Sequence, residues 1–227
     1  PNIVFDKSID LPILIDFGLS INMDNLIPSN LYNYFYVYAP QYYIWPLEVH
    51  YMNLLIHVTA SPTNDELLNL AREFTLKHRA LISFSDNFKS KYIDLCYKIL
   101  LSYNTLSLEG KKNKILKAWK SWDNYSLSVI YIKIIYYLNK NTGNKIVNNK
   151  LVQSLIELFL INIHPDFTKR LSIKDTLDKF NKIINMEESI ELINELRKNI
   201  TKNKKAIGKE IQLESKREEV LSLQIKR

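Results

Sequence analysis

The chain has 227 residues, a formal net charge of +7, 46% hydrophobic residues, four glycines and one cysteine. This hydrophobic share is enough to build a buried core, so the composition excludes disordered, collagen-like and disulfide-stabilised proteins for most of the length. The single thiol, Cys96, fits a reducing compartment, and we expect a cytoplasmic protein in which Cys96 is a buried apolar residue rather than a reactive one.

The longest apolar stretch, Val129 to Leu138, has about ten residues and contains Lys133, whereas a membrane span needs about twenty. We therefore expect no membrane-spanning segment and no membrane partner. No signal-peptide pattern opens the chain, which starts at Pro1, and we expect the chain to be a piece of a longer protein.

Ile, Lys, Asn and Tyr dominate the composition, as they do in proteins encoded by A/T-rich genomes. The excess of Lys over Arg then reflects codon usage as well as chemistry, which makes the net charge a weak argument for nucleic-acid binding. A helical nucleic-acid-binding protein is accordingly the last of three functional hypotheses.

In chain order, two short β-prone runs come first, at residues 2–5 and 11–15, in a pattern typical of a hairpin. Residues 19–45 have no apolar period and predict a long loop. From residue 47 to 184 the apolar spacing is helical. The blocks expected to be helices are 47–59, 64–84, 88–103, 110–121, 124–139, 149–163 and 172–184.

The tail from residue 186 to 227 differs in composition, because 18 of its 42 residues are charged and none is aromatic. Ile193, Ile200 and Ile207 recur at seven-residue spacing, but Glu214 and Gly208 interrupt the pattern. We expect a charged helix here rather than a coiled coil. The fold class is thus mainly α, with a small β-hairpin at the start and a charged helical tail at 186–227.

One constellation near the start of the chain carries chemistry. Asp16-Phe17-Gly18 follows the apolar run ending at Ile15, and Asn2 opens the other β-prone run. Adjacent strand ends would bring a carboxylate and an amide oxygen together, and two such oxygen ligands can hold Mg²⁺ against a polyphosphate. The four histidines show no spacing typical of a metal site.

Five motifs in register resemble the C-terminal lobe of eukaryotic-type protein kinases of the serine/threonine class. Asn2-Ile3-Val4 is similar to the end of the catalytic loop, and Asp16-Phe17-Gly18 to the metal-binding motif that opens the activation segment. Ala39-Pro40-Gln41 resembles the Ala-Pro-Glu that closes that segment. The run at 123–128 is similar to the start of the buried central helix, and the run at 164–172 to the Asp-Pro-x-x-Arg turn between the last two helices. Residues 45–57 are the alternative source of the central helix, but 123–128 match its Asp, aromatic, Ser and Leu at the right spacing.

The resemblance implies a role for each matching residue. ATP and Mg²⁺ would be the cofactors, with Asp16 and Asn2 as metal ligands and Val4 and Ile15 near the adenine. The remaining residues would be structural: Phe17 in an apolar column, Gly18 at a backbone turn, Asp123 bonded to the catalytic-loop backbone, and Arg170 paired with residue 41.

The sequence also departs from the family pattern. The catalytic-loop base and the phosphate-holding Lys would lie before Pro1, so we expect this chain alone to be inactive and to bind nucleotide weakly. Gln41 replaces the expected Glu, which removes the charge from its pair with Arg170; Glu48 is an alternative partner if the loop path differs. Gln41 and Asp123 are 82 positions apart, so residues 46–118 form a helical insertion of the kind found in giant-virus kinases.

The first hypothesis is therefore a protein-kinase C-lobe at residues 1–185, taken from a parent that transfers the γ-phosphoryl group of ATP to a protein hydroxyl. The alternative is a pseudokinase or scaffold whose insertion at 46–118 or tail at 186–227 binds a protein partner. Asp16 and Asn2 favour the first hypothesis, while Gln41 favours the second.

Overall fold

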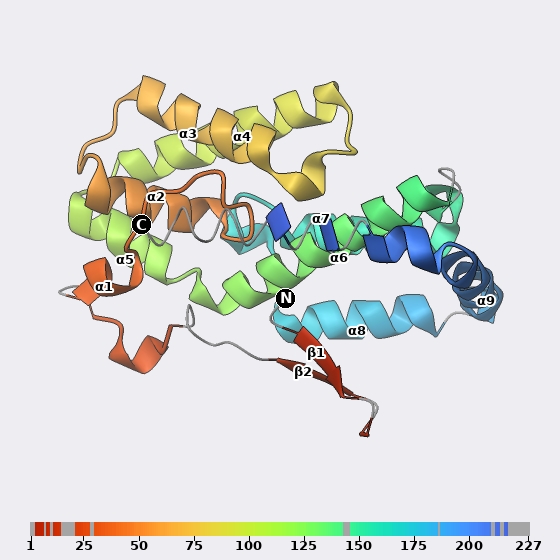
Figure 1. The fold of residues 1–227 in the computed structure, drawn as a ribbon. Helices are drawn as coiled ribbons and strands as arrows, with labels where there is room; N and C mark the ends of the chain where they lie inside the picture. The colour runs from red at the N-terminus through yellow and green to blue at the C-terminus, as the bar shows by residue number, and fades with distance from the viewer. Residues whose placement is uncertain are drawn as a thin grey trace.

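The structure is a computed structural model that describes residues 3–6, 8–9, 11–14, 21–27, 30–142, 146–185, 187–209, 212–213 and 216–217. It is mainly helical, as the sequence predicted (Figure 1). The α-helices are α1 (Leu31–Tyr34), α2 (Leu47–His57), α3 (Asn64–Lys77), α4 (Asp86–Asn104), α5 (Leu108–Leu116), α6 (Trp122–Asn141), α7 (Lys150–Asn162), α8 (Ile173–Ile184) and α9 (Glu187–Lys202).

Short 3-10 turns connect several of these helices: η1 (Met23–Asn25), η3 (Arg79–Leu81), η4 (Trp119–Ser121), η5 (Ile146–Asn148) and η6 (Phe167–Lys169). Strand β1 (Ile3–Asp6) pairs antiparallel with β2 (Leu11–Leu14), and the register places Asp6 opposite Leu11. In the turn between them, the carboxylate of Asp6 accepts hydrogen bonds from the backbone and the hydroxyl of Ser8.

Capping residues fix where the helices begin. Thr63 and Glu66 form a reciprocal capping box at the start of α3, which satisfies two backbone N–H groups that the helix leaves free. Ser85, Asn149 and Ser172 cap α4, α7 and α8 with their side-chain oxygens. Local sequence therefore sets these boundaries, as side-chain caps commonly do.

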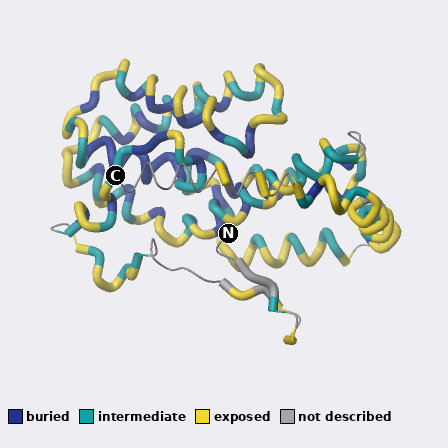
Figure 2. The backbone as a smooth tube through the Cα atoms, viewed as in Figure 1, coloured by how far each residue is buried: buried dark blue, intermediate teal, exposed yellow. Residues whose placement is uncertain are grey.

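Helix α2 is buried along most of its length, since every residue from Leu47 to Leu55 is buried (Figure 2). Helix α3 packs against both α2 and α4, α5 packs against α2, and α7 packs against both α6 and α8. One core cluster joins side chains of α2, α3, α4 and α5 to side chains of α6 and α7. The segment 46–118 therefore shares its hydrophobic core with the later helices.

The helical blocks expected from the sequence correspond to α2 through α8. The block at 64–84 differs, because α3 ends at Lys77 and the separate turn η3 follows. His78 has an extended backbone, with φ −71° and ψ 105°, and this conformation breaks the helix. The block at 110–121 is also divided, because α5 ends at Leu116 and the turn η4 follows. The segment at 19–45, expected to be a loop, contains η1 and α1 within its described part.

Candidate functional site

The best-defined polar site is a buried ion pair between the first turn of α2 and the turn before α8. Pro46 precedes α2 with an extended backbone, and Glu48 follows in the first turn with no exposed surface. A carboxylate at a helix N-terminus is favoured by the helix dipole. Burial of Glu48 nevertheless requires a cationic partner, because an unpaired buried carboxylate is very costly.

Arg170 supplies the positive charge. Asp166 caps η6 by accepting a hydrogen bond from the backbone of Thr168 at 3.0 Å, and the backbone N–H of Arg170 donates to the carbonyl of Phe167 at 3.2 Å. The side chain of Arg170 is 1% exposed. This turn therefore holds the guanidinium inside the protein, where it reaches the first turn of α2.

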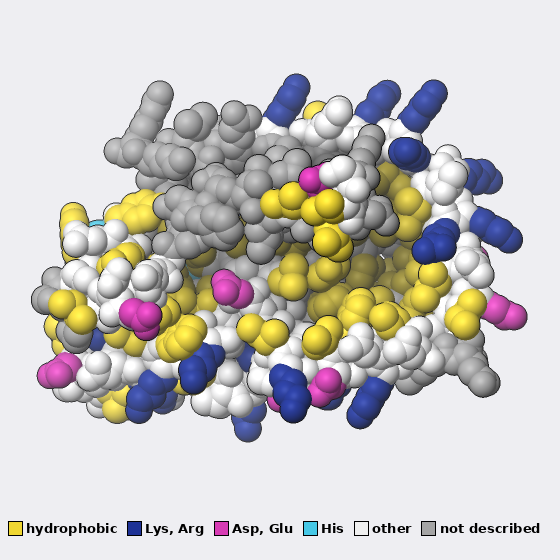
Figure 3. All heavy atoms as spheres, turned by 90° about the horizontal axis from the view of Figure 1, so that it is seen from below, with side chains coloured by type: hydrophobic (Ala, Val, Ile, Leu, Met, Phe, Trp, Pro, Cys, Tyr) yellow, Lys and Arg dark blue, Asp and Glu magenta, His cyan; other side chains and the backbone are white. Residues whose placement is uncertain are grey.

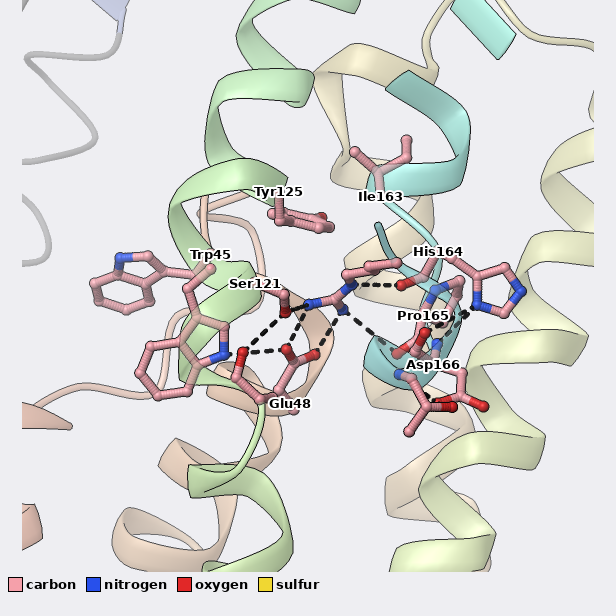
Figure 4. A network of polar contacts seen from close by, with 12 residues as sticks. Trp45, Glu48, Ser121, Tyr125, Ile163, His164, Pro165 and Asp166 are labelled. Atoms are coloured by element: carbon pink, nitrogen blue, oxygen red, sulfur yellow. Dashed lines mark hydrogen bonds and ion pairs between the residues drawn. The ribbon is translucent and has the colours of Figure 1, made fainter. Parts of the chain in front are cut away.

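The two side chains meet in bidentate geometry (Figure 4). Nη1 of Arg170 donates to Oε1 of Glu48 at 2.6 Å, and Nη2 donates to Oε2 at 2.8 Å. The indole Nε1 of Trp122 donates to Oε1 at 3.1 Å. Parallel charge-assisted hydrogen bonds of this length are among the strongest in proteins.

The other donors of Arg170 are also satisfied. Nε donates to the carbonyl of His164 at 2.8 Å, Nη1 to the hydroxyl of Ser121 at 3.1 Å, and Nη2 to the carbonyl of Pro165 at 3.5 Å. The guanidinium carbon lies 5.0 Å from the ring centroid of Tyr125, a cation–π contact. Burial by itself would lower the pKa of Arg170, but the charge and hydrogen bonds of Glu48 raise it above its ordinary value.

This network fixes the arrangement of the helices and is not arranged for proton transfer. It connects α2, the start of α6 and the turn between α7 and α8, and the polar atoms of its two charged side chains are all paired. A fully hydrogen-bonded buried ion pair fixes one arrangement of the chain, because breaking it leaves a charge uncompensated.

A second buried polar network holds α8 against α6 and α7. The amide of Asn162 donates to Oδ1 of Asn124 at 3.4 Å and to the hydroxyl of Ser128 at 3.1 Å. Asn124 donates to Thr176 at 2.8 Å, and Thr176 donates back to Asn162 at 3.3 Å. The hydrogen bonds thus close a ring among three helices without any charged group.

Two buried histidines lie next to Phe74, whose ring centroid is 5.5 Å from that of His50 and 5.4 Å from that of His78. Nε2 of His50 is 3.1 Å from the carbonyl of Trp45, and Nε2 of His78 is 2.9 Å from the hydroxyl of Tyr125. Within the described part of the chain, the buried Nδ1 atoms of both histidines have no hydrogen-bond partner. Burial lowers the pKa of His50 to about 4, and burial together with the charge of His50 lowers that of His78 to about 3.

The residues that the sequence assigned to metal and nucleotide binding lie mostly outside the described part of the chain. This holds for Asn2, Ile15, Asp16, Phe17 and Gly18. The backbone of Val4 belongs to β1, but its side chain is outside what the structure describes. The sequence-based ligand set for Mg²⁺ and ATP therefore stays a prediction.

The predicted pairing of Arg170 with residue 41 is corrected by the structure. Gln41 is exposed, whereas Arg170 is buried and binds Glu48. The chain turns twice after Pro40, with Tyr42 donating to the carbonyl of Ala39 and Trp45 to that of Tyr42. These turns carry the chain on to Pro46, so the first carboxylate to reach Arg170 comes from α2.

A signal for this partner exists in the sequence. In Trp45-Pro46-Leu47-Glu48 an acidic residue lies two positions after a proline, and this glutamate is seven positions after Gln41. Glu48 had been left open as the alternative partner of Arg170, and the structure selects it. The apolar residues around Glu48 also marked it as a carboxylate that needs a buried partner.

Asp123, in the first turn of α6, is exposed, and its carboxylate has no hydrogen bond to any described residue. The neighbouring Asn124 is the buried polar residue at this helix start, where it donates to the carbonyl of Leu171 at 3.2 Å. The predicted contact of Asp123 with the catalytic-loop backbone would involve atoms outside the described residues.

Among the described residues, no cluster of three or more His, Cys, Asp or Glu side chains is arranged to hold a metal ion. No helix in the same part of the chain is long and apolar enough to cross a membrane. Comparison with protein-family models, with curated proteins and with solved structures finds no match to this chain.

Proposed function

We propose that this chain is the C-terminal lobe of a serine/threonine-type protein kinase that acts in the cytoplasm. One observation carries the proposal: a buried bidentate ion pair between Glu48, just after the segment 19–45, and Arg170, in the turn between α7 and α8. In the kinase family, the acidic residue that ends the activation segment pairs with the arginine of the Asp-Pro-x-x-Arg turn.

The position of the pair relative to the other motifs supports the same reading. His164-Pro165-Asp166 precedes Arg170, and the carbonyls of His164 and Pro165 accept hydrogen bonds from its guanidinium. Helix α6 begins beside the pair, at the run that resembles the central helix of the family. With Glu48 in place, the loss of charge at residue 41 no longer argues against an active enzyme.

In this proposal Asp16 and Asn2 hold Mg²⁺ on the phosphates of ATP, because the charge on the transferring phosphoryl group must be neutralised in the transition state. The chemistry is transfer of the γ-phosphoryl group to a protein hydroxyl. The base and the phosphate-holding lysine would come from sequence before residue 1.

The test is a radiolabelled phosphate-transfer assay on the longer gene product that contains this chain, with Ser, Thr and Tyr peptides as acceptors. Asp16→Ala and Asn2→Ala should each lower kcat by at least about 100-fold. Asp24→Ala is the matched control, because this exposed carboxylate lies in η1 of the same N-terminal segment, and it should leave kcat unchanged.

Transfer that survives Asp16→Ala would overturn the assignment of the metal site. A folded, soluble protein that transfers no phosphate would instead favour the second function, a pseudokinase scaffold. In that event the helices of 46–118 and the tail at 186–227 become the surfaces on which to search for a protein partner.

A further inference from the structure

Helix α8 presents an apolar row to solvent. Ile173 is 60% exposed and Leu177, one turn later, is 55% exposed. Helix α6 adds a similar row at the i, i+4 and i+7 positions: Leu127, Tyr131 and Ile134, each at least 41% exposed. Figure 3 looks onto the side of the molecule on which α8 lies and shows hydrophobic side chains gathered in the middle of that side.

We call the surface formed by these five residues the α8 face. Exposed apolar side chains gathered on one side of a protein commonly mark an interaction site. The face is also presented on ordered structure, since the Asn124–Thr176 hydrogen bond fixes α8 on α6. The remaining question is what covers it, and the charges beside it give an answer.

Lys174 and Asp178 are both exposed and lie one turn apart on the same edge of α8. With 3.6 residues per turn, they are rotated by about 60° and 100° from Leu177 in the same direction. No ion pair joins them to another described residue. The apolar row of α8 is thus bordered on one edge by a positive charge, Lys174, followed one turn later by a negative charge, Asp178.

We propose that the α8 face is the interface of a twofold-symmetric dimer of this chain, with the two copies of α8 packed antiparallel. A twofold axis pairs a surface with itself, so the surface must be self-complementary. Antiparallel packing reverses the order of the charges, so Lys174 of each copy lies opposite the other copy's Asp178. The apolar rows of the two α8 helices pack between these ion pairs, and the α6 rows extend the contact.

An opposite-charge pair repeated by symmetry also sets the register of the two helices. The inference does not depend on phosphoryl transfer.

The first experiment is sedimentation velocity on the 227-residue chain over roughly 1 to 100 µM, a range that covers weak to moderate dimers. The chain should shift from the monomer mass to twice that mass and no further. Leu177→Glu should raise the Kd by about 100-fold or more, since it places a charge at the centre of the interface. Leu76→Glu is the control, because Leu76 is 64% exposed on α3, which lies away from α8 in Figure 1, and it should not change the Kd.

A charge-exchange experiment tests the antiparallel pairing itself. Lys174→Asp alone and Asp178→Lys alone each place like charges opposite one another and should each raise the Kd by roughly 3- to 10-fold. An equimolar mixture of the two variants should restore the Kd of the original chain, because every cross-pair in the mixed dimer is again of opposite sign. Unfolding curves of the two variants serve as the control that both remain folded.

Four results would overturn the proposal. One is a monomer throughout the concentration range, and another is assembly beyond the dimer, which a closed twofold contact does not allow. The third is failure of the mixed variants to associate better than either variant alone. Equal weakening by Leu177→Glu and Leu76→Glu would likewise show that the association is not made through the α8 face.

Discussion

Arg170 and Glu48 are 122 residues apart in the sequence, yet they share two parallel hydrogen bonds of 2.6 and 2.8 Å in the interior of the protein. The pair links the first turn of the buried helix α2 to the turn that precedes α8. Trp122 and Ser121, at the start of α6, bind the same two side chains. This network of hydrogen bonds therefore joins α2, the start of α6 and the turn before α8.

Removing one member of this pair should be among the most damaging single changes in the chain. Glu48→Ala leaves the guanidinium of Arg170 buried and unpaired, and we expect a loss of about 3 to 5 kcal/mol in the free energy of unfolding. Urea denaturation followed by circular dichroism measures this loss. Asp86→Ala is the control, because Asp86 is fully exposed in its pair with Lys89, and it should cost less than about 1 kcal/mol.

The double variant Glu48→Leu with Arg170→Met separates two explanations. If the cost of Glu48→Ala comes from an uncompensated charge, replacing both partners with apolar residues should recover most of the lost stability. A double variant no more stable than Glu48→Ala would show instead that the hydrogen bonds themselves, and not the stranded charge, account for the effect.

Much of the helical body follows from local patterns. Apolar spacing predicted the helical blocks, and residues such as Thr63 and Ser172 supply caps where the structure begins α3 and α8. The end of α3 could not be placed in the same way, because His78 continues an apolar pattern. Its extended backbone leaves its side chain in the core beside Phe74 and Tyr125, which is a tertiary effect.

The polar contacts were harder to anticipate for a related reason. The turn that contains Arg170 was recognisable in the sequence. Its partner depends on how many turns the chain makes after Pro40, so Gln41 and Glu48 were both candidates. Asn124 and Asn162 carried no signal at all, because an isolated Asn in a helical pattern reads as a surface residue. Their burial follows from three helices meeting, which no local window of sequence contains.

The two buried histidines predict a loss of stability in mild acid. Their folded-state pKa values, about 4 for His50 and about 3 for His78, lie below the ordinary value of about 6.5 in an unfolded chain. As the pH falls below 6.5, the two histidines bind protons in the unfolded state but not yet in the folded state. The stability present above pH 6.5 is therefore lost progressively until the pH reaches the folded-state pKa values. Between pH 7 and 5.5 we expect the free energy of unfolding to fall by roughly 2 to 3 kcal/mol.

Urea unfolding curves at several pH values in this interval check the prediction. His50→Gln and His78→Gln should each remove about half of the pH dependence that these two histidines contribute, whatever their stability at pH 7. The double variant should keep only the smaller dependence from His164, whose pKa is also lowered by burial. A double variant that keeps the slope of the original chain would assign the effect to other groups.

The ring of hydrogen bonds around Asn162 should control how firmly α8 is held. Asn162→Ala leaves Asn124, Ser128 and Thr176 each short of a partner in the interior, at an expected cost of about 1 to 3 kcal/mol. Hydrogen exchange should show the largest increase in the amides of α8, which depends on this contact. The control is Asn113→Ala on the exposed side of α5, with a change within about 0.5 kcal/mol.

Cys96 offers a direct probe of the core. Its thiol is fully buried on α4, 4.0 Å from the hydroxyl of Thr75, and burial raises its pKa well above the ordinary value. Because the thiolate is the reactive form, a disulfide reagent at pH 8 should modify the folded chain at least about 1,000-fold more slowly than the chain in urea. The folded-state rate should also rise in step with the destabilisation caused by Glu48→Ala, since the reagent reaches Cys96 only when the core opens. Rapid stoichiometric labelling of the folded chain would contradict the packing of α3 against α4 described above.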